Sequence, residues 1–254
     1  MTLIDLQGKA LYSGDKEVKK AYLGGNVFYS LRQSIEPYAY KQTGMLYAYD
    51  FTQGSTEPYS TSNDVVAFKP VIFTNVTPVY TGTSMNLSAG LLRHQVTIAN
   101  ATSFYVSVTF DTVSAKTGTL FYMVTDFESH VRIEKQVSGN NITFMARYQY
   151  AGGSGENKVS PIITTPQTTL DLYIVSGSFA KFWVNGKPVG NFSQAYPGLV
   201  SNTYAGIYGA VDIYDYKVCL NPNYKVYLNP SATPETDAIV IEQYQNIQQR
   251  LQNI

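Results

Sequence analysis

The sequence predicts an all-β protein, built as an antiparallel sandwich of two sheets. Short runs that alternate apolar and polar residues recur along the middle of the chain, and Gly, Asn and Pro separate them. Charged residues make up 14% of the chain, against about 25% in a typical soluble domain, while 22 Tyr and 19 Gly suit strands and turns. A helical period appears only at the C-terminal end.

Three consecutive strands form the clearest part of the pattern. Alternating runs cover 118–124, 131–135 and 142–150, and polar turns separate them, so these strands should pair as antiparallel neighbours. After a Gly-rich loop at 151–157, further strands are expected at 159–163, from 170 onward and at 208–216.

One hairpin turn has the strongest local signal. Asn185-Gly186 joins two apolar strands, and both residue types tolerate the positive φ of a tight hairpin turn. Alternation in the first of these strands directs Phe182 and Val184 into the core and turns Trp183 to the other face. The predicted core comprises Phe121 or Tyr122, Ile133, Phe144, Leu172, Phe182, Val184 and Ile213.

The sandwich is assigned to residues 34–230, and the N-terminal segment 1–33 is separate from it. A hairpin pattern at 18–29 surrounds Gly24-Gly25-Asn26. Because two strands alone are marginal in water, this segment should dock onto its own sandwich or onto another protein.

The C-terminal segment 231–254 predicts a helix. Thr233 can cap its start, Pro234 suits the first helical position, and an apolar seam follows at Val240, Tyr244, Ile247, Leu251 and Ile254. The seam either packs on its own sandwich or joins copies of the chain in a short coiled coil. Apolar residues left in water at both ends argue against a monomer with both ends free.

Charge and cysteine content exclude several classes of partner and site. Eighteen Lys and Arg balance eighteen Asp and Glu, so there is no net field to attract nucleic acid or an anionic membrane. Cys219 is the single cysteine, which rules out an intrachain disulfide and a cysteine-based zinc site. No signal peptide or membrane-spanning run is visible in the sequence.

Three segments together resemble a known family of sandwiches. Leu46-Tyr-Ala-Tyr-Asp50-Phe51, the hairpin from Phe182 to Val189, and Gly209-Ala-Val-Asp-Ile213-Tyr-Asp215 are similar to the opening strand, the penultimate hairpin and the last strand of concanavalin A-like, laminin-G-like domains. The resemblance covers about residues 40–220 and implies a jelly-roll sandwich with a lectin-like role.

A second, shorter resemblance concerns Val18 to Tyr29. This segment is similar to a "K-x-Y-L-G-x-x-x-V-Y" hairpin near the ends of phage virion proteins, namely tail, baseplate and fibre components. It implies a virion protein, assembled in the host cytoplasm, that contacts host-surface carbohydrate during adsorption. Residues 1–33 would attach it to other virion proteins, and a trimer is favoured because phage fibres and spikes are commonly trimers. A decoration protein without a ligand is the alternative.

Aromatic and polar side chains near the loops are the candidate carbohydrate site. Sugars pack their C–H faces on aromatic rings, and Tyr and Trp add a polar tip. We expect Trp183, Tyr148, Tyr150 and Tyr204 to form this site, unless Trp183 is covered by the N-terminal hairpin or the C-terminal helix.

The family resemblance also bears on calcium binding and on catalysis. Many sandwiches of this family hold calcium, for which Asp126 and Glu128 are candidate ligands, with Asn140 and Asn141 nearby if the hairpin forms. Some members are retaining glucanases with an E-x-D-x-E type strand motif, but here His130 stands where the third acid should be. We therefore expect a binding protein without an enzymatic role, and no resident cofactor other than possible calcium.

Overall fold

A computed structural model describes the strands of the chain, most turns between the central strands, and a C-terminal helix. The described residues are 12–13, 16–17, 20–23, 26–30, 45–51, 72–74, 79–81, 83–87, 91–96, 103–124, 130–149, 155–175, 179–192, 203–208, 211–220 and 238–252. By its backbone contacts the chain divides into two units, Met1–Glu36 and Pro37–Ile254.

The first unit contains two small antiparallel ribbons. One pairs β1 (Tyr12–Ser13) with β2 (Lys16–Glu17), and the other pairs β3 (Lys20–Leu23) with β4 (Asn26–Ser30). The hairpin that the sequence predicts around Gly24-Gly25 is therefore present.

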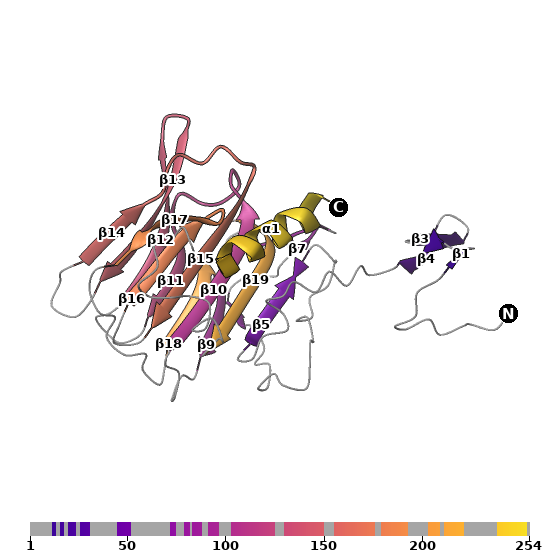
Figure 1. Ribbon diagram of the computed structural model, residues 1–254, viewed down its shortest axis with the longest axis horizontal. Coiled ribbons are helices and arrows are strands. Elements are labelled where there is room, and N and C mark those ends of the chain that lie inside the picture. The colour runs from indigo at the N-terminus through magenta and orange to yellow at the C-terminus, as the bar shows by residue number, and fades with distance from the viewer. Residues whose placement is uncertain are drawn as a thin grey trace. The chain divides into compact units, whose positions relative to one another are not determined.

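The second unit contains two antiparallel sheets (Figure 1). The eight-stranded sheet has the order β17-β16-β15-β10-β19-β8-β7, and β5 pairs with β19. Its strands are β5 (Met45–Asp50), β7 (Val79–Tyr80), β8 (Met85–Asn86), β10 (Ser103–Asp111), β15 (Gln167–Val175), β16 (Phe179–Val184), β17 (Lys187–Asn191) and β19 (Asp212–Leu220).

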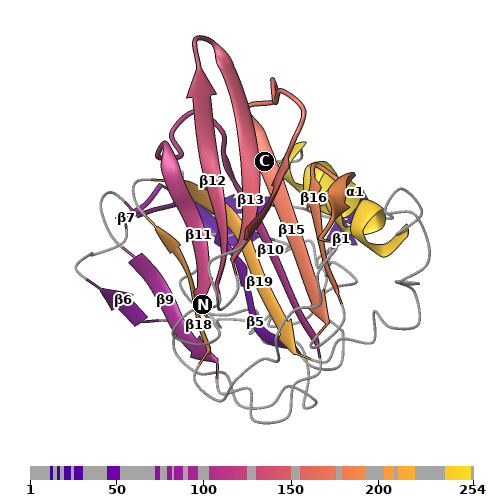
Figure 2. The same ribbon diagram turned by 90° about the vertical axis from the view of Figure 1, so that its left-hand side faces the viewer.

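The seven-stranded sheet has the order β14-β13-β12-β11-β18-β9-β6, and the β12–β13 hairpin projects beyond its neighbours (Figure 2). Its strands are β6 (Ile72–Thr74), β9 (Leu91–Val96), β11 (Gly118–Val124), β12 (His130–Ser138), β13 (Asn141–Gln149), β14 (Gly155–Val159) and β18 (Thr203–Tyr208). The predicted antiparallel meander β11–β12–β13 is confirmed.

The hydrophobic core lies between the two sheets because successive side chains of a strand face opposite sides. Phe110 of the eight-stranded sheet meets Phe144 of the seven-stranded sheet edge to face, with ring centroids 5.5 Å apart. All the predicted core positions are buried, with Phe121 rather than Tyr122 facing inward: Phe121, Ile133, Phe144, Leu172, Phe182, Val184 and Ile213.

Two predicted strands differ from the structure. The strand expected at 159–163 instead runs over Gly155–Val159, and Ile163 forms only an isolated bridge to Ile142. The strand expected at 208–216 corresponds to β19, but β19 begins at Asp212 and ends at Leu220, while Tyr208 is the last residue of β18 in the other sheet. A crossing between sheets leaves no mark in the alternation, since both sheets have the same period of two residues.

The Asn185-Gly186 turn forms the predicted tight hairpin between β16 and β17. Both residues have positive φ, 53° and 71°, as a type I′ turn requires. The Asn185 side chain ties the turn to its neighbours, because its Oδ1 accepts from the Thr169 backbone N–H at 2.8 Å and its Nδ2 donates to Thr165 Oγ1 at 3.0 Å.

A buried lysine closes one end of the sandwich. The ammonium of Lys135, on β12, donates to the backbone carbonyls of Thr112 (2.6 Å), Val113 (3.0 Å) and Ala115 (2.7 Å) in the turn between β10 and β11. Lys135 is only 4% exposed, and burial lowers its pKa while the charge of Asp111 opposes that shift. This one side chain therefore ties β12 to the turn that connects the two sheets.

The helix α1 (Ala238–Gln252) packs on the sandwich, and in both views it lies on the side of β15, away from the end of the β12–β13 hairpin. Val240 and Ile247 are fully buried, although neither belongs to the core between the sheets. A Cβ added to Gly186 would lie 3.0 Å from Tyr244 Cδ1, which shows how closely the helix approaches the β16–β17 turn. The residues expected to start the helix, 231–237, lie outside the described residues.

Replacing Lys135 with Met should lower the free energy of unfolding by about 2–4 kcal/mol, because three carbonyl acceptors would lose a charged donor. Denaturant titration measures the change. Lys116→Met is the matched control, since Lys116 lies in the same turn but is exposed, and it should have almost no effect. Equal stability of both variants would contradict the assigned role of Lys135.

Trp183 is the single tryptophan, so its fluorescence can test whether α1 covers it. Ile247→Asp places a charge at a fully buried position of the helix, and we expect it to shift the emission to longer wavelength as water reaches Trp183. Gln245→Asp, at an exposed position of the same helix, should leave the spectrum unchanged. An unshifted spectrum for Ile247→Asp would mean that α1 does not cover Trp183.

Candidate functional site

The outer face of the eight-stranded sheet is closed over β10, β15 and β16. Tyr105, Tyr173, Lys181, Asp171 and Trp183 alternate with inward-facing core residues of β10, β15 and β16, yet each is at most 1% exposed. The Tyr105 hydroxyl donates to Asp171 Oδ1 within this layer. A ligand would have to displace whatever covers these side chains before it could reach them.

The structure does not bring the predicted carbohydrate-site residues together on one surface. Trp183 faces away from the core, as alternation predicts, but is fully buried in this closed layer. Tyr148 is also fully buried and faces the core from the other sheet, where its ring packs edge to face on Phe192. A ligand role for Trp183 would require displacement of the residues that cover it.

The other predicted site residues cannot be placed. Tyr150, Asp126 and Glu128 lie outside the described residues. Tyr204 belongs to β18 and pairs with Val124 of β11, but its side chain lies outside the described part. The calcium prediction therefore stays a prediction. Within the described residues, no group of three or more His, Cys, Asp and Glu side chains is arranged to hold a metal ion.

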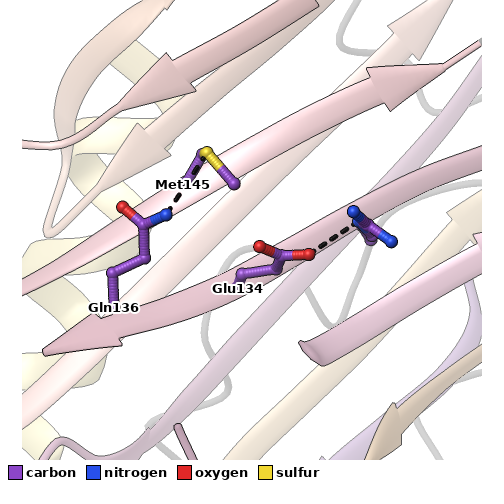
Figure 3. A network of polar contacts seen from close by, with 4 residues as sticks. Glu134, Gln136 and Met145 are labelled. Atoms are coloured by element: carbon purple, nitrogen blue, oxygen red, sulfur yellow. Dashed lines mark hydrogen bonds and ion pairs between the residues drawn. The ribbon is translucent and has the colours of Figure 1, made fainter. Parts of the chain in front are cut away.

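The outer face of the seven-stranded sheet is the open surface. On β11, β12 and β13 its side chains are half-buried or exposed, and we call this surface the polar face; it comprises Tyr122, His130, Arg132, Glu134, Gln136, Thr143, Met145, Arg147 and Gln149. Figure 3 shows Glu134, Gln136 and Met145 on the same side of β12 and β13, with Gln136 Nε2 3.5 Å from Met145 Sδ.

Two aromatic rings lie together on the polar face. The rings of Tyr122 and His130 have centroids 5.3 Å apart and planes inclined by 37°. Burial lowers the pKa of His130 below its usual value, and the charges of Arg132 and Arg147 lower it further. The imidazole is therefore neutral at pH 7.

Charged groups flank these rings. Tyr122, Arg132 and Arg147 occupy one row across β11, β12 and β13. Arg132 Nε lies 2.7 Å from Glu134 Oε1, and the side chains are 28% and 19% exposed. A pair of rings with guanidinium, carboxylate and amide groups at their edge can hold a flat apolar surface that carries polar substituents.

The described part of the polar face does not have the pair of carboxyl groups that hydrolysis of a glycosidic bond by acid–base catalysis requires. Glu134 is its sole carboxylate there, and Arg132 lies against it. Retaining hydrolysis of a glycosidic bond needs two carboxyl groups about 5–5.5 Å apart. Asp171 and Asp215 are both fully buried on the other sheet and do not supply the second one.

Comparisons with known proteins support the fold. No family model matches the chain, and no curated protein matches it. Among solved structures it is similar to domain 4 of AbnA, an extracellular GH43 arabinanase from Geobacillus stearothermophilus solved in complex with arabinotriose. The TM-score is 0.54 at 15% identity, over 80% of this chain and 100% of that domain.

The receptor-binding regions of two botulinum neurotoxins are also similar. The serotype D binding domain has a TM-score of 0.50 at 11% identity and the mosaic serotype C/D domain 0.50 at 12%, and this chain covers 51% of each. The chain shares the β-sandwich fold of these domains. At these identities the similarity concerns the fold, which agrees with the expected concanavalin A-like jelly roll. No helix among the described residues is long and apolar enough to cross a membrane.

Proposed function

We propose that this protein binds carbohydrate through the polar face and catalyses no reaction. The observation that carries the proposal is the contrast between the two outer faces. One is closed over β10, β15 and β16, where Tyr105, Tyr173 and Trp183 are at most 1% exposed, while the other presents the Tyr122–His130 ring pair beside hydrogen-bonding groups. Sugar rings combine an apolar face with hydroxyls at the edge, which is the complement of this surface.

The competing function is a glycan-processing enzyme of the retaining glucanase type. The polar face supports binding rather than hydrolysis because Glu134 has no second carboxylate beside it in the described part of that face. The similar domain of the arabinanase, solved with arabinotriose, supports the carbohydrate class but not a particular sugar.

The setting that we propose is a phage virion, in a tail, baseplate, fibre or decorated head, with assembly in the host cytoplasm. The resemblance of Val18 to Tyr29 to virion hairpins supports it, as does the separation of Met1–Glu36 as its own unit. Residues 1–33 would attach to a larger virion protein, and the polar face would contact host-surface glycans during adsorption. A decoration protein that binds no ligand is the alternative within this setting.

A homo-oligomer, with three copies favoured, belongs to the same proposal. Val240 and Ile247 of the helical seam are already buried within one chain, so they are not available to a coiled coil while α1 stays docked. Self-association would then use other surfaces.

Replacing Tyr122 with Ala should weaken glycan binding by about 1–3 kcal/mol, since the sugar would lose half of its aromatic platform. Calorimetric titration with a glycan identified on an array measures the change. Tyr214→Ala is the matched control: Tyr214 is a half-buried tyrosine on β19 of the other sheet and should not affect binding. Turnover of a bound polysaccharide that is lost in Glu134→Gln would contradict the non-enzymatic proposal.

Deleting residues 1–33 should abolish incorporation of the protein into phage particles, while the sandwich still folds because it forms a separate unit. Immunoblotting of purified particles measures incorporation, and circular dichroism of the truncated chain checks its fold. Normal incorporation of the truncated protein would contradict the attachment role.

A further inference from the structure

A like-charged pair lies in the middle of the polar face. Arg132 of β12 and Arg147 of β13 are direct cross-strand partners, and both are half-buried. Like charges directly opposite each other destabilise a sheet, and partial burial reduces the screening by water. The pair therefore costs stability in the free protein, and that cost falls when an anion binds between the two guanidinium groups.

The carboxylate of Glu134 compensates only part of this charge. It lies against Arg132 Nε at 2.7 Å, whereas Arg147 has no ion-pair or hydrogen-bond partner among the residues that the structure describes. A guanidinium group carries five donors in a fixed fork that fits a carboxylate at two points. Within the described part of the chain, Arg147 is thus the cation of the polar face that no carboxylate pairs with.

The ring pair lies at the right place to present a ligand to these cations. Tyr122 is the cross-strand partner of Arg132, and His130 lies two residues before Arg132 on the same face. Both arginine charges lower the pKa of His130, so their fields act at the surface of the rings. A sugar ring stacked on Tyr122 and His130 would therefore hold its edge substituents over the arginine row.

We propose that the polar face selects acidic saccharides, with the sugar carboxylate bound by Arg147 and Arg132. The inference rests on the proposed carbohydrate binding and names the class of sugar. A carboxylate is the favoured anion because Arg132 already binds the carboxylate of Glu134 in this geometry. Nucleic acid is disfavoured because the chain has a formal net charge of zero.

The test uses the full chain and pairs of oligosaccharides that differ only in charge: oligogalacturonate, oligoguluronate and hyaluronan fragments, each with its neutral methyl ester. Calorimetric titration at low salt should show tighter binding of at least one acid than of its ester. Arg147→Gln should weaken binding of that acid about 10–100-fold, and leave binding of the ester unchanged. Lys116→Gln removes an exposed charge elsewhere and should change neither.

The outcomes separate the inference from the proposed function. Binding of acid and ester with equal affinity, or an acid preference that survives in Arg147→Gln, overturns the inference and leaves carbohydrate binding in place. Binding of neutral glycans but of no acidic one would also overturn the inference and leave carbohydrate binding in place. Failure of the folded chain to bind any saccharide on a broad array overturns the proposed function, and the inference with it. A partial recovery of acid binding in Arg147→Lys supports a charge contact that also uses the guanidinium fork.

Discussion

Burial of two inner sheet faces against each other is the constraint on which the rest of this structure depends. It fixes the register of every long strand, because a slip by one residue would exchange core and surface side chains along the whole strand. Once Phe110, Phe144 and their neighbours are fixed inside, the side chains between them must face outward. The polarity and exposure of each outer face then depend on residues that core packing does not constrain.

The outer faces of the two sheets differ in their exposure to solvent. On β15 and β16 of the eight-stranded sheet the outward side chains include Trp183, Lys181 and Asp171, a mixture rich in polar groups, and this part of the layer is closed to solvent. On the seven-stranded sheet a comparable mixture of rings and charges stays open. Burying a charged group costs free energy unless other groups compensate its charge. We therefore assign the closed layer a structural role. The open layer keeps its polar groups available to a partner.

The fold and the core could be predicted from the sequence because both follow from local alternation and turn chemistry. Sequence analysis left Phe121 and Tyr122 as alternatives, and the irregularity between Thr119 and Phe121 decides between them in a way that strict alternation does not reveal. It placed Trp183 on the correct face and named the C-terminal helix as one segment that could cover it, but local alternation cannot decide whether a segment remote in sequence packs there. Tyr148 was foreseeable as a core residue, because it shares the parity of Phe144. The pairing of Arg132 with Arg147 was also within reach, since the turn at Gly139-Asn140 fixes their register.

The ammonium of Lys135 has a consequence for the chemical environments that the sandwich tolerates. Three carbonyl oxygens converge on it at 2.6–3.0 Å, an arrangement of hard oxygen donors around a positive charge that also suits a bound metal ion. Here the cation is tethered by its own side chain and cannot diffuse away. This end of the molecule therefore keeps its closure in media stripped of divalent ions, and a chelating agent has nothing to remove there.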